Sequence, residues 1–288
     1  MRDPTDGLIA GRFALESPLG TGGMATVHRA RDLQTGQTVA VKILATDTGI
    51  SNARRRFELE GRLIAGFSHP HIIGFVDMGP LGDDSVYLAL ELIEGGSLQD
   101  RLDRSGPLPL ADAVTIAEQV LEALIELHRQ GVVHRDLKPD NVLLAGGMHV
   151  VLIDFGLARI PDYQLTQVGR FLGSPAFAST EQLNGRPVSP ASDLFALGAL
   201  LYTMLTGHAP YPGDTAQEVR RHHGEPPAPP SAGRPEVPAA LDDLVMDLLN
   251  PWPTLRPQRA RDVLERLELI NVNAPELAWP QDRPSLAA

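Results

Sequence analysis

Short runs in which apolar and polar residues alternate fill most of the first third of the chain. This period of two is typical of β-strands that bury one face. One longer segment, residues 52–67, follows the period of a helix instead, with apolar residues at Phe57, Leu63, Ile64 and Phe67. We therefore expect a small sheet with a single helix. The predicted strands cover residues 12–19, 27–31, 38–44, 72–78 and 85–91.

Beyond these strands the apolar pattern becomes mainly helical. Residues 110–129 carry one apolar stripe, and Gly131 is placed to end that helix. His128, at the end of the stripe, is expected only to pack there. Two short apolar runs around Ala145-Gly146-Gly147 predict a β-hairpin. The runs are residues 142–144 and 150–153, and further helices are expected at 189–206, 239–249 and 259–269.

The remaining segments have little periodicity. Residues 1–11 are expected to be a short lead-in, and residues 271–288 a loose tail. The proline-rich residues 225–238 could be a polyproline ligand, but a connection between helices is the favoured interpretation. No internal repeat is visible.

Composition limits the class of protein. The chain has 288 residues and is 43% hydrophobic, enough for one large domain or two lobes. It contains no cysteine, which excludes disulfides, and its net charge of -11 argues against nucleic acid as a partner. The longest apolar stretch, Leu194 to Leu205, is too short to cross a bilayer. With no signal peptide at the start, we expect a soluble protein of the cytoplasm.

The candidate chemistry centres on residues 134–141, which read His-Arg-Asp-Leu-Lys-Pro-Asp-Asn. In an extended loop, Asp136 and Lys138 point the same way, and Pro139 disfavours a helix before it. Asp136 can accept a proton from a hydroxyl, Lys138 can neutralise a phosphoryl group, and Asn141 offers a neutral oxygen to Mg²⁺. By itself such a stretch could be a polar loop of no function. The predicted hairpin that follows it leads directly to Asp154-Phe155-Gly156 and would bring Asp154 close to Asn141.

The loop and the triplet together resemble the catalytic signatures of protein kinases. Lys138, two residues after Asp136, resembles the serine/threonine rather than the tyrosine kinases. The short, lysine-poor chain with Gly22-Gly23-Met24 in its glycine-rich loop resembles the bacterial type. The resemblance implies an α+β fold of two lobes, a small β-rich N-lobe and a larger helical C-lobe, with ATP between them. It also implies that Asp136 and Lys138 are catalytic and that Asn141 and Asp154 bind the metal, Mg²⁺ with Mn²⁺ as the alternative.

The resemblance extends to an ATP-binding flap. A glycine-rich loop lies between two predicted strands rather than before a helix, as in the kinase flap. Its third glycine is replaced by Ala25, which adds one methyl group and is expected to be tolerated. The backbone of Glu91 and Ile93 would bind the adenine edge. The residues implied to contact ATP are Leu19, Gly20, Thr21, Gly22, Gly23, Met24, Ala25, Val27, Ala40, Lys42, Glu91, Ile93 and Leu143.

Lys42 and Lys138 are the only lysines among 25 basic residues. All other basic positions are arginine, so a compact ammonium is kept only at the two positions where it would meet phosphate. The resemblance gives Lys42 a catalytic ion pair on the predicted helix 52–67. Glu58 and Glu60 are both candidates, and the register of the motif favours Glu60.

A later segment resembles the substrate-docking segment of protein kinases, with two departures. Ser174 replaces a threonine and Thr180 replaces a proline, while Glu181 is kept and is implied to pair with Arg256. Asp193 is implied to anchor the turn at His134, whose ring is expected to support the core.

Thr166 is the candidate for activating autophosphorylation, with Arg135, Arg56 and Arg159 as the arginines that would hold the phosphate.

The boundaries implied are 12–92 for the N-lobe and 93–270 for the C-lobe. The expected partners are ATP and a protein substrate, and autophosphorylation would allow a homodimer. Two other functions are weighed. A pseudokinase scaffold is disfavoured because all four catalytic and metal positions are filled. An antibiotic-kinase type of small-molecule phosphotransferase lacks the segment from Gly173 to Glu181.

Overall fold

The structure is a computed structural model that describes residues 8–21, 25–45, 53–82, 85–154 and 175–270. Contacts divide these residues into two compact units. Unit 1 takes the described residues up to Ile93 and those from Leu152 to Asp154, and unit 2 takes Glu94–Val151 and the described residues from Pro175 onward.

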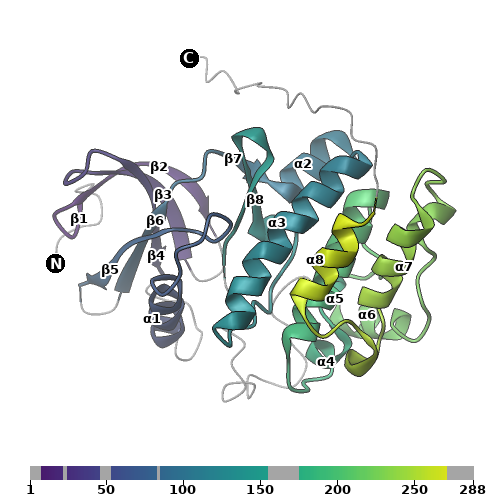
Figure 1. The fold of residues 1–288 in the computed structure, drawn as a ribbon. Helices are drawn as coiled ribbons and strands as arrows, with labels where there is room; N and C mark the ends of the chain where they lie inside the picture. The colour runs from purple at the N-terminus through teal and green to yellow at the C-terminus, as the bar shows by residue number, and fades with distance from the viewer. Residues whose placement is uncertain (1–7, 22–24, 46–52, 83–84, 155–174, 271–288) are drawn as a thin grey trace. The chain divides into compact units, whose positions relative to one another are not determined.

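Unit 1 is built on a twisted antiparallel sheet with the strand order β1-β2-β3-β4-β6-β5 (Figure 1). Neighbours in the chain pair as hairpins, except that α1 separates β4 from the β5–β6 pair. The elements are β1 (Leu8–Ile9), β2 (Phe13–Thr21), β3 (Ala25–Asp32), β4 (Thr38–Leu44), α1 (Ala53–Ile64), β5 (Phe75–Leu81) and β6 (Ser85–Glu91).

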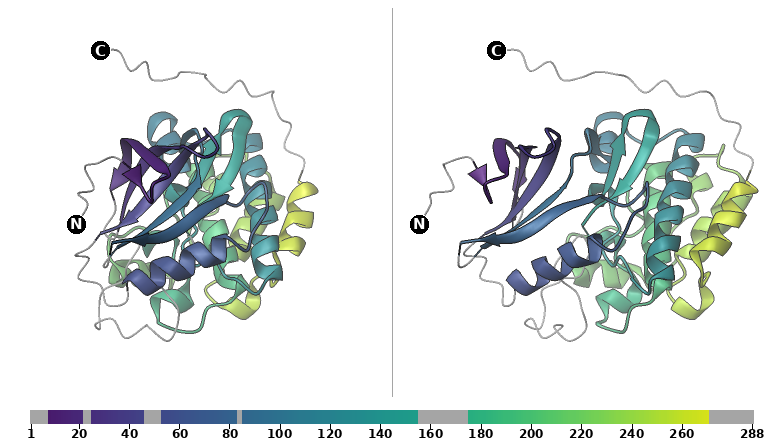
Figure 2. Two further views of the ribbon diagram at one scale, coloured as in Figure 1. Left: turned by 90° about the vertical axis from the view of Figure 1, so that its left-hand side faces the viewer. Right: turned by 60° about the vertical axis from the view of Figure 1, so that its left-hand side comes forward.

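The core of unit 1 follows from the alternation in its strands. Val39 and Val41 are buried in β4 and pack with Phe13, Tyr87 and Ala89 in one cluster. Helix α1 packs on β4, β5 and β6, and the views of Figure 2 show it lying along the sheet. The helix can lie this close because its facing residue is a glycine, since a Cβ at position 61 would collide with the Met78 sulfur.

Two predicted boundaries in unit 1 were wrong. Leu8 and Ile9, which were expected to belong to the lead-in, form strand β1, because Ile9 pairs with Phe13 and is buried in the core. The strand expected at 72–78 begins only at Phe75. Ile73 is buried and donates its amide to the Leu152 carbonyl instead, so its apolar character reflects a tertiary contact rather than membership of the sheet.

Unit 2 is mainly helical and includes a small sheet of order β7-β8-β9. Helix α3 packs against both α5 and α8, which lie side by side with it in Figure 1. The elements are β7 (Gly95–Ser97), α2 (Leu98–Ser105), α3 (Leu110–Arg129), η2 (Pro139–Asn141), β8 (Val142–Ala145), η3 (Gly146–Met148), β9 (His149–Leu152), η6 (Pro175–Phe177), α4 (Thr180–Leu183), α5 (Pro190–Thr206), α6 (Ala216–His222), η7 (Pro230–Ala232), α7 (Ala239–Leu248), η8 (Pro253–Leu255) and α8 (Ala260–Glu268).

The centre of unit 2 is α5, which is apolar on all sides and is buried over nearly its whole length. A helix of this kind must lie inside a domain, because every face would otherwise expose apolar surface. Helix α3 has the predicted bounds, and Gly131 follows its end with a left-handed φ of 74°. The predicted hairpin is present as β8 and β9, and the proline-rich 225–238 segment forms a connection with one turn of 3-10 helix.

The helices α2 and α6 were missed by the periodicity. Both are short and largely polar, but each begins with a capping box, Ser97 with Asp100 in α2 and Thr215 with Glu218 in α6. The α+β class, with a β-rich first part and a helical second part, is confirmed. None of the helices in the described parts of the chain is both long and apolar enough to cross a membrane.

Candidate active site

Lys42 lies on β4 in unit 1, on the same face of the sheet as Val27 and Ala40. Val27 is directly opposite Lys42 in the β3–β4 register, and Ala40 is two residues earlier on β4. Directly paired residues and residues two apart share a face, so the three side chains form one surface. Alternation along β4 and the β3–β4 register together place these predicted ATP contacts on one surface.

The Lys42 ammonium is held by two carboxylates. Its Nζ is 2.9 Å from Glu60 Oε1 and 2.6 Å from Asp154 Oδ1. The sequence left Glu58 as a second candidate, but Glu58 accepts a hydrogen bond from Arg54 one helical turn earlier. Glu60 is therefore the residue of α1 that reaches Lys42.

This cluster keeps Lys42 charged. Burial alone lowers the pKa of Lys42, but the carboxylates of Asp154 and Glu60 outweigh burial and raise it. Burial raises the pKa of Glu60 despite the opposing effect of Lys42, and the Asp154 carboxylate adds to the rise. Asp154 is the more accessible carboxylate, with 49% of its side chain exposed against 15% for Glu60. Its φ of 54° is left-handed, which aspartate tolerates better than most residues.

The other residues predicted to contact ATP fall in several elements. Leu19, Gly20 and Thr21 end β2, and Ala25 begins β3 with its methyl group buried. Gly22, Gly23 and Met24 lie outside the described residues. Glu91 ends β6 and donates its amide to the Gly74 carbonyl, and Ile93 follows in the same unit. Leu143 lies on β8 in unit 2, opposite Ser97.

The predicted catalytic loop in unit 2 brings three side chains together. Asn141 Nδ2 donates to Asp136 Oδ2 at 3.0 Å and to the Asp136 carbonyl at 2.8 Å. Lys138 Nζ is 3.5 Å from Asp136 Oδ2, and Lys138 has the extended backbone that was expected. Pro139 then begins the turn η2, which brings Asn141 back to Asp136. The loop therefore holds an acceptor oxygen and an ammonium side by side.

The backbone before Asp136 is anchored by Asp193 of α5. The Asp193 carboxylate accepts the amides of His134 at 2.8 Å and Arg135 at 2.9 Å. His134 is fully buried, and its Nδ1 accepts the Asp136 amide. The expectation that His128 only packs was wrong, because its Nε2 is 2.8 Å from Asp193 Oδ2. A buried aspartate is costly unless it is paired, which is the signal that could have identified His128.

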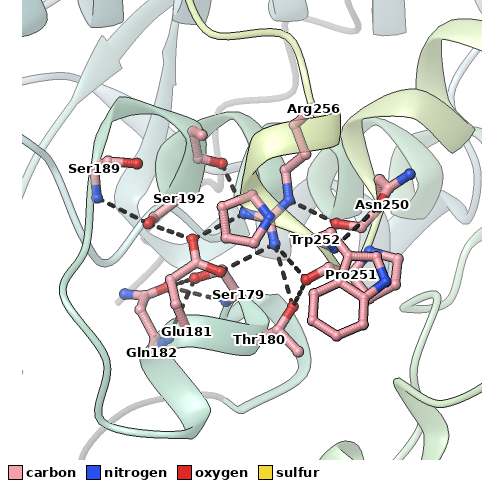
Figure 3. A network of polar contacts seen from close by, with 12 residues as sticks. Ser179, Thr180, Glu181, Gln182, Ser189, Ser192, Asn250, Pro251, Trp252 and Arg256 are labelled. Atoms are coloured by element: carbon pink, nitrogen blue, oxygen red, sulfur yellow. Dashed lines mark hydrogen bonds and ion pairs between the residues drawn. The ribbon is translucent and has the colours of Figure 1, made fainter.

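A second polar network joins α4 to the segment before α8 (Figure 3). Arg256 binds both oxygens of Glu181, at 2.9 and 3.0 Å, and both side chains are buried. Burial raises the pKa of Glu181, but the hydrogen bonds from Arg256 and Ser192 lower it by more than burial raises it. The pKa of Glu181 is therefore below its usual value. Thr180, which stands where a proline was expected, donates to the Pro251 carbonyl at 2.6 Å and accepts from Arg256. Ser192 and Thr180 are members of this network that the sequence did not indicate.

The residues proposed to hold a metal have suitable chemistry. Asn141 has its Nδ2 fixed on Asp136, which leaves Oδ1 as its oxygen for a cation, and Asp154 supplies an accessible carboxylate. In the described parts of the chain, three or more His, Cys, Asp or Glu residues do not gather into a metal cluster. Mg²⁺ commonly takes only one or two carboxylates and completes its shell with phosphate and water, so the oxygen that each residue offers is of a kind that Mg²⁺ binds.

Several predicted regulatory positions cannot be placed. Phe155, Gly156, Arg159, Thr166 and Ser174 lie outside the described residues. Arg135 is described, and burial lowers the pKa of its guanidinium although Asp193 opposes the shift. Arg56 is buried on α1.

Comparison with known proteins agrees with this geometry. The family described as "Protein kinase domain" matches residues 13–266. The serine/threonine-protein kinase pkn2 of Myxococcus xanthus is 36% identical over 278 residues, which are 93% of this chain and 33% of that protein. The serine/threonine-protein kinase PknL of Mycobacterium tuberculosis (strain ATCC 25618 / H37Rv) is 35% identical over 286 residues, 98% of this chain and 71% of that protein.

A third relative is the probable serine/threonine-protein kinase CE0033 of Corynebacterium efficiens, 35% identical over 279 residues, with 93% of this chain and 42% of that protein covered. The chain thus spans a third to a half of the length of several relatives that it matches. The family match covers most of the chain and includes both described units, and the fold and family predicted from the sequence are confirmed. The chain belongs to the protein kinase family.

Proposed function

We propose that the protein transfers the γ-phosphoryl group of ATP to serine or threonine hydroxyls of a protein substrate. The observation that carries this proposal is the catalytic loop, in which Lys138 and Asn141 both lie against the Asp136 carboxylate. The ion pair between Lys42 and Glu60 supports it, because a scaffold without activity would have no need of this pair. The relatives named serine/threonine-protein kinases point to the same activity.

Each residue has a role in this proposal. Asp136 orients the substrate hydroxyl and accepts its proton, and Lys138 neutralises charge on the transferring group. Lys42, held by Glu60, binds the α- and β-phosphates. Asn141 and Asp154 would hold Mg²⁺, with Mn²⁺ as the alternative, and the metal would supply charge neutralisation for the phosphates.

The nucleotide base is proposed to contact residues of the sheet and of β8. Val27 and Ala40 already share a face with Lys42, and Leu143 would lie on the other side of the adenine ring. The backbone of Glu91 and Ile93 would bind the adenine edge. The flap residues Leu19, Gly20, Thr21, Gly22, Gly23, Met24 and Ala25 would cover the phosphates.

Autophosphorylation at Thr166 is proposed to activate the enzyme. A phosphothreonine carries about -1.5 to -2 charges at neutral pH and forms strong bonds with arginine. Arg135 directly precedes Asp136 and is half-buried, so a phosphate bound there would act next to Asp136. Two copies of the chain could phosphorylate each other in a homodimer.

The test is an acceptor screen with the purified chain and Mg-ATP. We expect phosphate on serine and threonine of a generic protein substrate, and none on aminoglycosides or free serine. Mass spectrometry of the same reaction should locate phosphate on Thr166, and Thr166→Ala should lower the rate. Transfer only to a small molecule, or no ATP turnover at all, would contradict the proposed activity. Full activity in Thr166→Ala would contradict the switch alone.

Lys42→Arg is expected to lower kcat by about 10²-fold although the charge is kept, because a guanidinium is wider than the ammonium and displaces the phosphates by about 1 Å. Steady-state kinetics and ATP titration would measure this. Arg54→Lys is the matched control, since Arg54 forms an exposed ion pair with Glu58 on α1 and should leave kcat unchanged. A kcat near the wild-type value in Lys42→Arg would refute the assignment of Lys42.

A further inference from the structure

The backbone directly before the proposed catalytic base has an unusual conformation. Arg135 has a φ of 69°, in the left-handed region that few residues other than glycine occupy. Such a conformation persists only where the surroundings hold it in place. Because Asp136 is the next residue, a rotation of the Arg135 peptide group would swing the Asp136 carboxylate away from its position.

The peptide groups around Arg135 are held from two directions. Asp193 accepts the amides of His134 and Arg135, as described above. The carbonyl oxygen of Arg135 is held separately, by Gln182 of α4, whose Nε2 donates to it at 2.7 Å. The two residues are 47 positions apart in the chain, and both belong to unit 2.

The orientation of the Gln182 amide is fixed by its partners. Its Oε1 accepts the backbone amide of Ser179 at 3.0 Å, as part of the capping box of α4. A backbone amide can only donate and a carbonyl can only accept, so Nε2 must face Arg135 and Oε1 must face Ser179. Gln182 therefore joins the N-terminus of α4 to the catalytic loop through a single side chain.

Helix α4 is itself firmly placed. The next residue before Gln182 is Glu181, which is bound to Arg256 in the buried network of Figure 3. Thr180 adds a bond to the Pro251 carbonyl. Gln182 thus reaches the Arg135 carbonyl from a helix that cannot shift easily. Its hydrogen bond therefore restricts the movement of the Arg135 peptide group.

We propose that Gln182 is a positioning residue for catalysis: by holding the Arg135 carbonyl, it fixes the left-handed turn that aims the Asp136 carboxylate at the substrate hydroxyl. This rests on the proposed function, in which Asp136 is the base. It predicts that Gln182 acts on the rate of phosphoryl transfer and not on ATP binding, because none of its described contacts involves a residue proposed to bind ATP.

The decisive variant is Gln182→Glu. A carboxylate keeps the oxygen that caps Ser179 but replaces the donor to Arg135 with an acceptor, so two oxygens oppose each other. We expect kcat to fall by about 10- to 100-fold, because displacing a reacting group by about 1 Å costs that much. The KM for ATP should stay within about 2-fold of the wild-type value, since only the chemical step loses an interaction. Gln182→Met, which removes donor and acceptor without adding charge, should give the same selective loss of kcat.

The chain offers a matched control in Gln119 of α3. Its Nε2 donates to the Met148 carbonyl at 3.0 Å and its Oε1 accepts the Val150 amide at 2.9 Å. Met148 is also left-handed, with a φ of 64°. Gln119→Glu therefore breaks the same kind of hydrogen bond to a backbone carbonyl, at a turn away from Asp136. It should lower the melting temperature as much as Gln182→Glu does, while leaving kcat within about 3-fold of wild type.

The outcomes separate the two proposals. If the wild-type chain does not phosphorylate protein, the proposed function fails before the variants are compared. If the wild type is active and either folded Gln182 variant keeps its kcat, the positioning role is wrong. The role is also wrong if Gln119→Glu loses as much kcat as Gln182→Glu, because general loosening of unit 2 would then explain both.

Discussion

Asp136→Asn should lower kcat by about 10²- to 10⁴-fold, the range that a general base contributes, while the Kd for ATP stays within a factor of about 2. The asparagine has nearly the same shape and can keep the contact with Asn141, so the loop should retain its fold. What it loses is the charge that accepts the hydroxyl proton. ATP affinity should hold because the proposal assigns nucleotide binding to Lys42 and the flap.

The matched control is Asp140→Asn, four residues later in the same loop. Asp140 is exposed and has no proposed role in transfer, so the same chemical change there should leave kcat unchanged. Single-turnover kinetics with protein substrate, beside calorimetric titration of ATP, would separate chemistry from binding. A Kd for ATP that rises in parallel with the loss of rate would place Asp136 at the nucleotide instead and refute its role as the base.

The sequence predicted those elements whose pattern is set by one strong period. Helix α3 and strand β6 have the expected bounds, because each buries one regular face. The onset of β5 could not be found in this way. Ile72 and Ile73 are as apolar as a strand requires, yet they pair with the backbone at Leu152, about 80 residues away, and no local pattern encodes that contact.

In the candidate site too, some features follow from a local pattern and others depend on contacts between distant residues. Local spacing put Ala40 and Lys42 on one face, since a strand repeats every two residues. Val27 lies on another strand, and its place on that face depends on the β3–β4 register. The choice of Glu60 over Glu58 needed the resemblance to protein kinases, because both lie on α1 within two residues of each other. The bond between Gln182 and Arg135 could not be predicted at all. A capping box at Ser179 explains why position 182 is glutamine, and nothing in the sequence indicates that its other amide atom reaches the catalytic loop.

Arg256→Ala should destabilise unit 2 by about 3–5 kcal/mol, which is the cost of removing one partner of a buried ion pair. None of the Arg256 side chain is exposed, and only 4% of the Glu181 side chain is. Besides Glu181, the guanidinium donates to the carbonyls of Asn250 at 2.6 Å and Ala191 at 3.0 Å. It also lies 4.8 Å from the centre of the Phe195 ring. Alanine would leave the Glu181 charge and these carbonyls buried without their donor.

Urea unfolding followed by circular dichroism would measure the loss, with Arg259→Ala as the control. Arg259 forms an ion pair with Asp262 at 2.6 Å, but 77% of its side chain is exposed. Exposed pairs contribute only about 0–1 kcal/mol, so this variant should unfold almost like the wild type.

A double variant, Glu181→Leu with Arg256→Met, tests whether the unpaired charge of Glu181 causes the destabilisation by Arg256→Ala. Replacing both members of a buried ion pair with apolar residues of similar volume is often close to neutral, because the desolvation cost of both charges disappears with their attraction. The double variant should therefore recover much of the stability that Arg256→Ala loses. If Arg256→Ala costs less than about 1 kcal/mol, the pair resembles an exposed one and its burial has no energetic consequence. If the double variant is as unstable as Arg256→Ala, the carbonyl bonds to Asn250 and Ala191 stabilise this junction more than the ion pair does.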